Sequence, residues 1–242
     1  MIRQARLAAF LQGLQQSGWI DGGNARIDTR WAAGNSDYTR KYLAELLTLA
    51  PDVILAAGSQ SVGPLLQTTR AVPIVFVHVP DPVGAGFVDS LARPGRNATG
   101  FTLMEYSTGG KWLELLKEIA PGVTRVAVIR DSAITGGIGQ WASIQSMAPS
   151  VGVEIIPVNM PDAAEIERSV MAFARGANGG LILTASGSAF VHHGLIIALA
   201  ARYKLPEVYF ERFFVAKGGL ISYGAELLDQ YRRAAAYVDR IL

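Results

Sequence analysis

A continuous apolar run at Ile74–Val77 limits the folds open to this chain more than any other feature. The run is rich in β-branched residues, follows Pro73, and gives way abruptly to the polar residues His78 and Asp81. This composition is typical of a strand buried on both faces of a parallel sheet. Because ligands of open α/β sheets bind outside the carboxyl ends of strands, His78 and Asp81 are candidate ligand contacts. The alternative for Asp81 is a local role, in which it opens a turn and caps the next helix.

Strand and helix patterns alternate along the rest of the chain, which predicts an α/β fold with parallel sheets. The expected strands lie at 25–31, 52–56, 74–77, 98–101, 125–129, 153–158, 179–184, 208–210 and 220–224. The expected helices lie at or through 3–17, 36–50, 65–66, 87–91, 112–119, 141–148, 166–173, 197–201 and 227–241. Ser36 is predicted to cap the second helix, and Asp162 with Glu165 has capping-box spacing.

A polar connection that contains glycine, Glu105–Gly110, interrupts this alternation. A new series of strand and helix patterns begins after it. We therefore predict two lobes, each a parallel sheet flanked by helices. The first lobe is expected to comprise residues 1–103 plus 224–242, and the second residues 104–223.

Composition excludes several classes of function. The 22 Lys and Arg against 20 Asp and Glu give a net charge of only +2, and the basic residues are scattered, so we expect no nucleic-acid partner. The chain has no cysteine, which excludes disulfides, thiolate metal sites and cysteine nucleophiles. With three histidines a histidine-rich metal site is not expected either, and we expect no metal and no cofactor.

Polar clusters at the predicted carboxyl ends of strands are the candidate site. They are Ser59, Gln60, Ser61, His78 and Asp81 in the first lobe and Asp131, Ser132, Ser186, Glu211 and Tyr223 in or near the second. The serines at 59–61 stand between a strand and a helix, where free N–H groups and the helix dipole face a bound anion. The alternative is ordinary N-capping by a serine.

Five stretches resemble a known family in its own order. They are VPIVFVHVPDPVGAGFVDSLARPGRNATGF at 72–101, GWIDGGNARIDTRWAAG at 18–34, GKWLELLKEIAPGVTRVAVIRD at 110–131, GGLISYG at 218–224 and YRRAAAYVDRIL at 231–242. The chain resembles the ABC-transporter substrate-binding proteins, whose pattern reads like PIVF…DPV..G.V.SL..PG.N.TG. The resemblance spans nearly the whole chain.

This resemblance implies a two-lobed, type I periplasmic-binding-protein fold. It also implies a non-catalytic protein that captures a small organic ligand in the cleft between its lobes and delivers it to an ABC permease. An amino acid, and an aromatic one in particular, is the expected ligand class. Ser59–Ser61 could then hold its carboxylate, and Asp81 or Asp131 its ammonium group.

The same resemblance leads to an expectation about the ends of the chain. Family members carry a signal segment and a first strand before the first helix, and a return segment after the last; we expect both to be absent here. Residues 1–20 lack the apolar core of a signal peptide, and no apolar run reaches the ~18–20 residues that span a bilayer. The resemblance implies a periplasmic protein, but the chain as written would stay in the cytoplasm.

The missing first strand carries a further expectation. Its loss would break the sheet or bring Ala25–Trp31 beside Asp52–Ala56. Unpaired strand edges should then favour self-association.

Three other functions are compatible with parts of the sequence. Ser59–Gly63 follows a strand and precedes a helix, as in the nucleophile elbow of hydrolases with Ser61 as nucleophile, but it lacks the first glycine of that motif. Thr135–Gly139 follows a strand without matching the dinucleotide-binding pattern. The ligand-sensing part of a transcription regulator shares the fold class, and fold alone does not separate sensing from transport.

Overall fold

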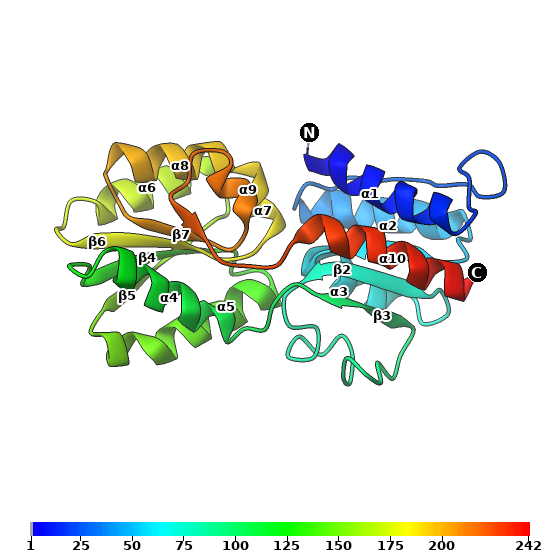
Figure 1. Ribbon diagram of the computed structural model, residues 1–242, viewed down its shortest axis with the longest axis horizontal. Coiled ribbons are helices and arrows are strands. Elements are labelled where there is room, and N and C mark those ends of the chain that lie inside the picture. Colours follow the sequence, from blue (N-terminus) through cyan, green and yellow to red (C-terminus); the bar gives the residue numbers. More distant parts are fainter. Residues whose placement is uncertain (1) are drawn as a thin grey trace. The chain divides into compact units, whose positions relative to one another are not determined.

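The computed structural model describes residues 2–242, with side chains from Gln4 onward. Its helices flank two parallel sheets, one of three strands and one of five (Figure 1). The chain divides into two compact units, which are described separately below. Unit 1 comprises the residues up to Leu103 together with Glu226–Leu242, and unit 2 comprises Met104–Ala225. The predicted α/β class with parallel sheets is confirmed.

The three-stranded sheet of unit 1 is centred on the apolar run that dominates the sequence. The unit contains α1 (Ile2–Gln16), α2 (Ser36–Thr48), β1 (Ile54–Ala57), α3 (Ser59–Thr68), β2 (Ile74–Val79), β3 (Ala98–Thr102) and α10 (Leu227–Ile241). The strands are parallel in the order β1-β2-β3, with Ile74 of β2 opposite Ile54 and Ala98. All residues of β2 are buried, as a strand covered on both faces requires.

Alternate residues of β2 reach two apolar clusters on opposite faces of this sheet. Val75 and Val77 pack against α1 and α10, which lie side by side although they come from opposite ends of the chain (Figure 1). Phe76 packs with buried residues of α2, α3 and the segment after β2. The last helix is therefore an integral part of unit 1.

Unit 2 has a five-stranded sheet with a reversal of strand order. Its elements are α4 (Thr108–Ile119), β4 (Arg125–Arg130), α5 (Thr135–Met147), η1 (Ala148–Val151), β5 (Glu154–Asn159), α6 (Ala163–Phe173), β6 (Gly179–Leu183), α7 (Gly187–Val191), α8 (His193–Arg202), β7 (Glu207–Tyr209), α9 (Arg212–Val215) and β8 (Ile221–Ser222). The strands are parallel in the order β5-β4-β6-β7-β8. Numbered within the unit, this is the flavodoxin-like order 2-1-3-4-5. The chain moves from β4 to β5 in one direction along the sheet and from β5 to β6 in the other. Because such crossovers are right-handed, α5 and α6 lie on opposite faces of the sheet.

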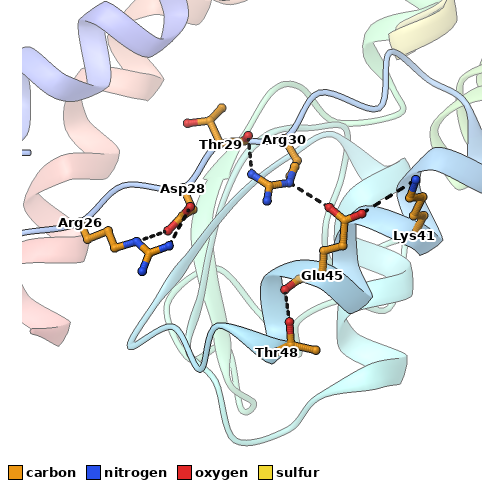
Figure 2. A network of polar contacts seen from close by, with 7 residues as sticks. All are labelled: Arg26, Asp28, Thr29, Arg30, Lys41, Glu45 and Thr48. Atoms are coloured by element: carbon orange, nitrogen blue, oxygen red, sulfur yellow. Dashed lines mark hydrogen bonds and ion pairs between the residues drawn. The ribbon is translucent and has the colours of Figure 1, made fainter.

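The strand predicted at Ala25–Trp31 is wrong. Within residues 2–242 this segment joins no ladder and does not pair with β1. Local contacts hold it instead: the Ile27 N–H donates to Asp21 Oδ1 at 2.9 Å, and Arg30 pairs with Glu45 of α2 at 3.1 Å (Figure 2). Alternating side chains indicate an extended backbone, but only a neighbouring strand turns it into part of a sheet.

The short helix predicted at Phe87–Leu91 is also wrong, and turns replace it. The Phe87 N–H donates to Pro82 O at 2.9 Å, but Gly86 has a φ of 70°. That left-handed conformation ends any right-handed helix at once, and glycine adopts it without steric cost.

The predicted helix caps are confirmed at one position and wrong at another. Asp162 caps α6 and accepts the Glu165 N–H at 2.8 Å, as its spacing predicts. Ser36 is the first residue of α2, and Asn35 is the N-cap instead, accepting the Asp37 N–H at 2.9 Å. Both residue types cap well, so composition alone did not separate two adjacent candidates.

Gly13 should be required for the contact between α1 and α10. A Cβ added at this glycine would lie 2.6 Å from the Arg232 carbonyl oxygen, a backbone atom. Alanine gains about 1 kcal/mol of helix propensity, but overpacking typically costs about 1–3 kcal/mol. We expect Gly13→Ala to lower the free energy of unfolding by about 1–2 kcal/mol in urea titrations followed by circular dichroism. Gly194→Ala in α8, with nothing within 4 Å of the new Cβ, is the control. Equal losses in both variants would contradict this packing role.

Glu207 of β7 should make the stability of unit 2 depend on pH. The residue is buried, and burial raises the pKa of its carboxyl to about 7 against the opposing effect of neighbouring donors such as the Leu220 N–H. The folded state therefore favours the protonated acid, so its contribution to stability is full below about pH 4.5 and is lost as pH rises through about 7.

The neutral variant Glu207→Gln isolates this effect. The unfolding free energy of the wild type relative to the variant should fall between pH 4.5 and pH 7.5 by an amount on the order of 1–3 kcal/mol. Urea titrations at both pH values measure the difference. Parallel pH profiles for the two proteins would show that Glu207 does not titrate in this range.

Candidate functional site

The reversal of strand order in unit 2 marks one part of the candidate site. In doubly wound sheets the ligand crevice lies at the carboxyl ends of the two strands where the order reverses, which here are β4 and β6. Asp131 directly follows β4, and the Ser188 Oγ donates to its Oδ2 at 3.1 Å. The Ala133 N–H donates to Oδ1 at 3.1 Å. The loop after β4 and the first turn of α7, the helix after β6, therefore meet at the half-buried Asp131 carboxylate.

Ser186 lies at the same carboxyl end and is buried. It is the N-cap of α7, where its Oγ accepts the Ala189 N–H at 3.0 Å. Gln140 of α5 holds Ala185, the residue before Ser186, because the Gln140 Oε1 accepts the Ala185 N–H at 2.9 Å. Gln140 is fully buried, and its Nε2 has no hydrogen-bond partner in the part of the chain that the structure describes. Sequence reasoning missed Gln140, since a glutamine inside a helix pattern carries no signal of burial.

Glu211 comes shortly after β7 and is buried, and aromatic residues stand on both sides of it in the sequence. The ring centroid of Phe210 lies 5.0 Å from that of Phe214 and 5.5 Å from that of Phe190. The ring centroids of Phe190 and Phe213 are also 5.5 Å apart. Phe190 and Phe213 are half-buried, so their rings are accessible at the end of the sheet. We call Phe190, Phe210, Phe213 and Phe214 the aromatic cluster. Sequence reasoning missed it, although the run Phe210-Glu-Arg-Phe-Phe214 was visible.

The remaining two candidates of unit 2 are less enclosed. Ser132 is exposed, and the Tyr223 side chain is 49% exposed. The Tyr223 carbonyl oxygen accepts the Nε1–H of the buried Trp112 at 2.8 Å, so this residue anchors α4 through its backbone. Their roles in ligand binding stay predictions.

In unit 1 the serine cluster occupies the first turn of α3. Gly58 is the N-cap, with a φ of 79°, and Ser59 is the first helical residue, so serine capping does not occur. Ser59 is buried, and its Oγ has no hydrogen-bond partner among residues 2–242. Gln60 and Ser61 are half-buried. The first turn of a helix directs N–H groups outward, and this arrangement is suited to an anion.

His78 is buried at the end of β2, where its backbone has a φ of 60°. Burial, and secondarily the Arg6 guanidinium, holds the pKa of His78 well below its usual value, so its imidazole is neutral at pH 7. The His78 N–H donates to Gln230 Oε1 at 3.0 Å, while Gln230 Nε2 donates to the Thr102 carbonyl at 3.1 Å. Gln230 of α10 thus joins the carboxyl ends of β2 and β3.

Asp81 has the turn contact that its alternative interpretation predicts, but the helix that it was expected to cap does not form. Its Oδ1 accepts the Gly84 N–H at 2.7 Å, and its backbone has a φ of 38°. The carboxylate is half-buried. Asp81 therefore stabilises the turn after β2, and a contact with ligand stays a prediction.

The described residues also bear on metal binding and on membrane insertion. Within residues 2–242 no group of three or more His, Asp or Glu side chains is placed to hold a metal ion. Over the same residues, none of the helices combines the length and the apolar character that crossing a membrane requires.

Gly137, part of the glycine-rich run after β4, sits where a Cβ would clash with the Asp131 backbone. That glycine thus permits close packing of α5 on the β4 loop.

Two α/β units, each with a parallel sheet flanked by helices, form a two-lobed type I periplasmic-binding-protein fold. A family model described as ABC transporter substrate binding protein matches residues 3–242. The chain belongs to this family, as its sequence motifs predict.

The chain is similar to three further proteins. A tyrosine-binding protein of Clostridioides difficile is 25% identical over 217 residues, which cover 90% of this chain and 62% of that protein. A conserved domain protein from Vibrio cholerae O1 biovar eltor is 25% identical with a TM-score of 0.90, over 98% of this chain and 79% of that one. An ABC domain from Streptococcus pneumonia in complex with L-Trp has a TM-score of 0.83 at 18% identity, over 98% and 81% of the two chains. This chain therefore spans less than two thirds of the curated relative's length.

Gln230 should stabilise unit 1 through its two hydrogen bonds. Gln230→Leu keeps an apolar stem but leaves the His78 N–H and the Thr102 carbonyl without this partner. Unsatisfied buried groups cost about 1–3 kcal/mol each. We therefore expect the variant to have a free energy of unfolding lower by about that amount, measured by urea titration. Gln15→Leu on the exposed side of α1 is the control and should change stability by less than about 0.5 kcal/mol. A Gln230 variant as stable as this control would contradict the role.

Proposed function

We propose that the chain is the solute-binding component of an ABC importer and binds an amino acid with an aromatic side chain. The observation that carries the proposal is the pairing of Asp131 with Ser188 where the strand order of unit 2 reverses. The family assignment supports the transport role. The name of the C. difficile relative, a tyrosine-binding protein, supports the ligand class.

An α-amino acid presents an ammonium group and a carboxylate. The half-buried Asp131 carboxylate, held by two hydrogen bonds, supplies an acceptor for the ammonium group. In unit 1, the first turn of α3 offers N–H groups and the buried Ser59 hydroxyl, a combination suited to an anionic group. Ser186 and Glu211 are further polar groups at strand ends, and sites for small molecules use only a few such groups.

The aromatic part of the proposed ligand is matched to the aromatic cluster. Phe190 and Phe213 expose ring surface beside the strand ends that carry Ser186 and Glu211. Aromatic pairs in offset or edge-to-face geometry are worth about 0.5–1.5 kcal/mol beyond the area that they bury. The cluster therefore favours an aromatic ligand over an aliphatic one of the same charge.

We propose that the chain binds without catalysis. A nucleophile elbow holds its serine on the sharp turn between strand and helix. Here Gly58 occupies that turn, and Ser61 lies within the first turn of α3, where its N–H donates to the Gly58 carbonyl at 3.0 Å. Ser61→Ala should leave any esterase activity of the preparation unchanged.

The partners and location of the natural protein follow from the same proposal. An ABC permease would accept the ligand, and binding would take place in the periplasm or at the cell surface, where solutes are captured. Self-association through free strand edges stays a prediction. Gel filtration across a range of protein concentrations measures it.

Calorimetric titration with ligands that differ by one group tests the site. We expect L-tyrosine and L-tryptophan to bind, L-alanine to bind at least about tenfold more weakly, and 3-(4-hydroxyphenyl)propionate, which lacks the ammonium group, to lose the contact with Asp131. Asp131→Asn should weaken L-tyrosine about tenfold or more and leave the propionate unchanged.

Asp229→Asn on the exposed face of α10 is the matched control and should bind like the wild type. Equal binding of L-alanine and L-tyrosine would refute the aromatic preference. Binding of L-tyrosine that is insensitive to Asp131→Asn would refute the assigned ammonium contact. No binding by any amino acid would contradict the proposed ligand class.

A further inference from the structure

An arginine occupies a core position of α1. The buried side chains of Ala9, Phe10 and Leu14 form the apolar stripe through which this helix packs in unit 1. Arg6 lies one turn earlier on the same stripe and is only 8% exposed. Burying a guanidinium is costly even where it is paired, and an apolar residue of similar volume usually serves stability at least as well. Stability alone therefore does not explain an arginine at this position.

Arg6 lies at the carboxyl end of β2. Its guanidinium carbon is over the ring of Tyr231, 5.9 Å from the ring centroid, in α10, which runs beside α1 (Figure 1). Burial and, after it, the charge of Arg6 lower the pKa of His78, which places the guanidinium near that imidazole. Because ligands of parallel α/β sheets bind at the carboxyl ends of strands, Arg6 belongs to the region where a ligand is expected.

The electrostatic potential at this end of β2 is positive. Neither of these two neighbours of Arg6 brings a negative charge, since His78 is neutral at pH 7 through its lowered pKa and Tyr231 offers the face of an aromatic ring. The N-terminus of α3 adds to the potential, because its N-cap Gly58 donates its N–H to Val77 O at 3.0 Å. A buried cation and a helix dipole thus act at the same strand end.

The chemistry of this strand end suits a carboxylate. A guanidinium presents its N–H donors in a planar fork that matches the two oxygens of a carboxylate. Such charge-assisted hydrogen bonds are strongest in a buried site, where water screens them little. The first turn of α3 adds the buried hydroxyl of Ser59, whose Oγ has no hydrogen-bond partner among residues 2–242. These features favour an organic carboxylate over a neutral or cationic group.

We infer that Arg6 is the residue of unit 1 that binds a carboxylate, through its guanidinium at the carboxyl end of β2. Tyr231 holds the guanidinium through its ring, and Gln230, the residue before it, joins the ends of β2 and β3. The anchoring of α10 thereby fixes the surroundings of the Arg6 side chain. Where the carboxylate belongs to an amino acid, the inference rests on the function proposed above, whereas the contact itself requires only the carboxylate.

Ligands that differ only in the carboxylate test the contact. Calorimetric titration compares L-tyrosine with L-tyrosinamide, in which a neutral amide replaces the carboxylate, at about pH 6, where both carry an ammonium group. We expect the wild type to bind L-tyrosinamide at least about tenfold more weakly. Benzoate and 3-(4-hydroxyphenyl)propionate extend the comparison to carboxylates without an ammonium group.

Substitutions of Arg6 locate the contact. Arg6→Met removes the charge and keeps much of the volume, so we expect the variant to fold, as circular dichroism would show. It should weaken binding of the three carboxylates about tenfold or more and of L-tyrosinamide less than about twofold. Arg6→Lys keeps the charge without the planar fork and should bind L-tyrosine with intermediate affinity. Arg240→Met, which removes the same charge from the exposed end of α10, is the control and should bind every ligand like the wild type.

A loss that Arg6→Met confines to the carboxylates supports the inference. A variant that weakens L-tyrosine and L-tyrosinamide equally would show a purely structural role for Arg6, and one that weakens neither would exclude the contact; both results overturn the inference. Equal binding of these two ligands by the wild type also overturns it, and that comparison holds even if a variant does not fold.

The ligands without an ammonium group separate this inference from the proposed function. If amino acids do not bind but benzoate or the propionate binds in a way that depends on Arg6, the inference stands and the proposed ligand class fails. If L-tyrosine binds with no dependence on Arg6, the proposed ligand class stands and the inference fails. If none of the four ligands binds, both fail.

Discussion

Burial of β2 on both faces is the constraint on which unit 1 depends. A fully buried strand needs apolar cover from both sides, and the cover comes from parts of the chain far apart in sequence: α1 and α10 on one face, α2 and α3 on the other. The close approach of α1 and α10 at Gly13 and the hydrogen bonds of Gln230 follow from this arrangement. The same helix therefore completes the core and fixes the strand ends where a ligand is expected.

The chemistry at the strand ends differs between the two units because their sheets differ. Unit 2 has the 2-1-3-4-5 order, and its reversal brings the loop after β4 and helix α7 after β6 together at Asp131. Among the described residues of unit 1 the order is β1-β2-β3, which has no such reversal.

Much of the fold could be predicted because buried parallel strands are recognisable in the sequence as apolar runs rich in β-branched residues, such as Ile74–Val77. The failures have physical causes. Ala25–Trp31 alternates as a strand does, but pairing depends on a neighbour that periodicity does not reveal. At Phe87–Leu91 the backbone conformation of Gly86 overrides helical spacing. For the site, polar residues after strands were found from sequence, whereas Gln140 and the aromatic cluster depend on packing between distant elements.

The most direct test of the central claim, that this chain is a solute-binding protein, is a native mass spectrum of the purified chain with a denatured spectrum beside it. The account predicts a small-molecule adduct with the mass of an aromatic amino acid, present only in the native spectrum and restored by adding L-tyrosine to stripped protein. A native spectrum that contains only the bare chain, even with L-tyrosine and L-tryptophan in excess, would contradict it.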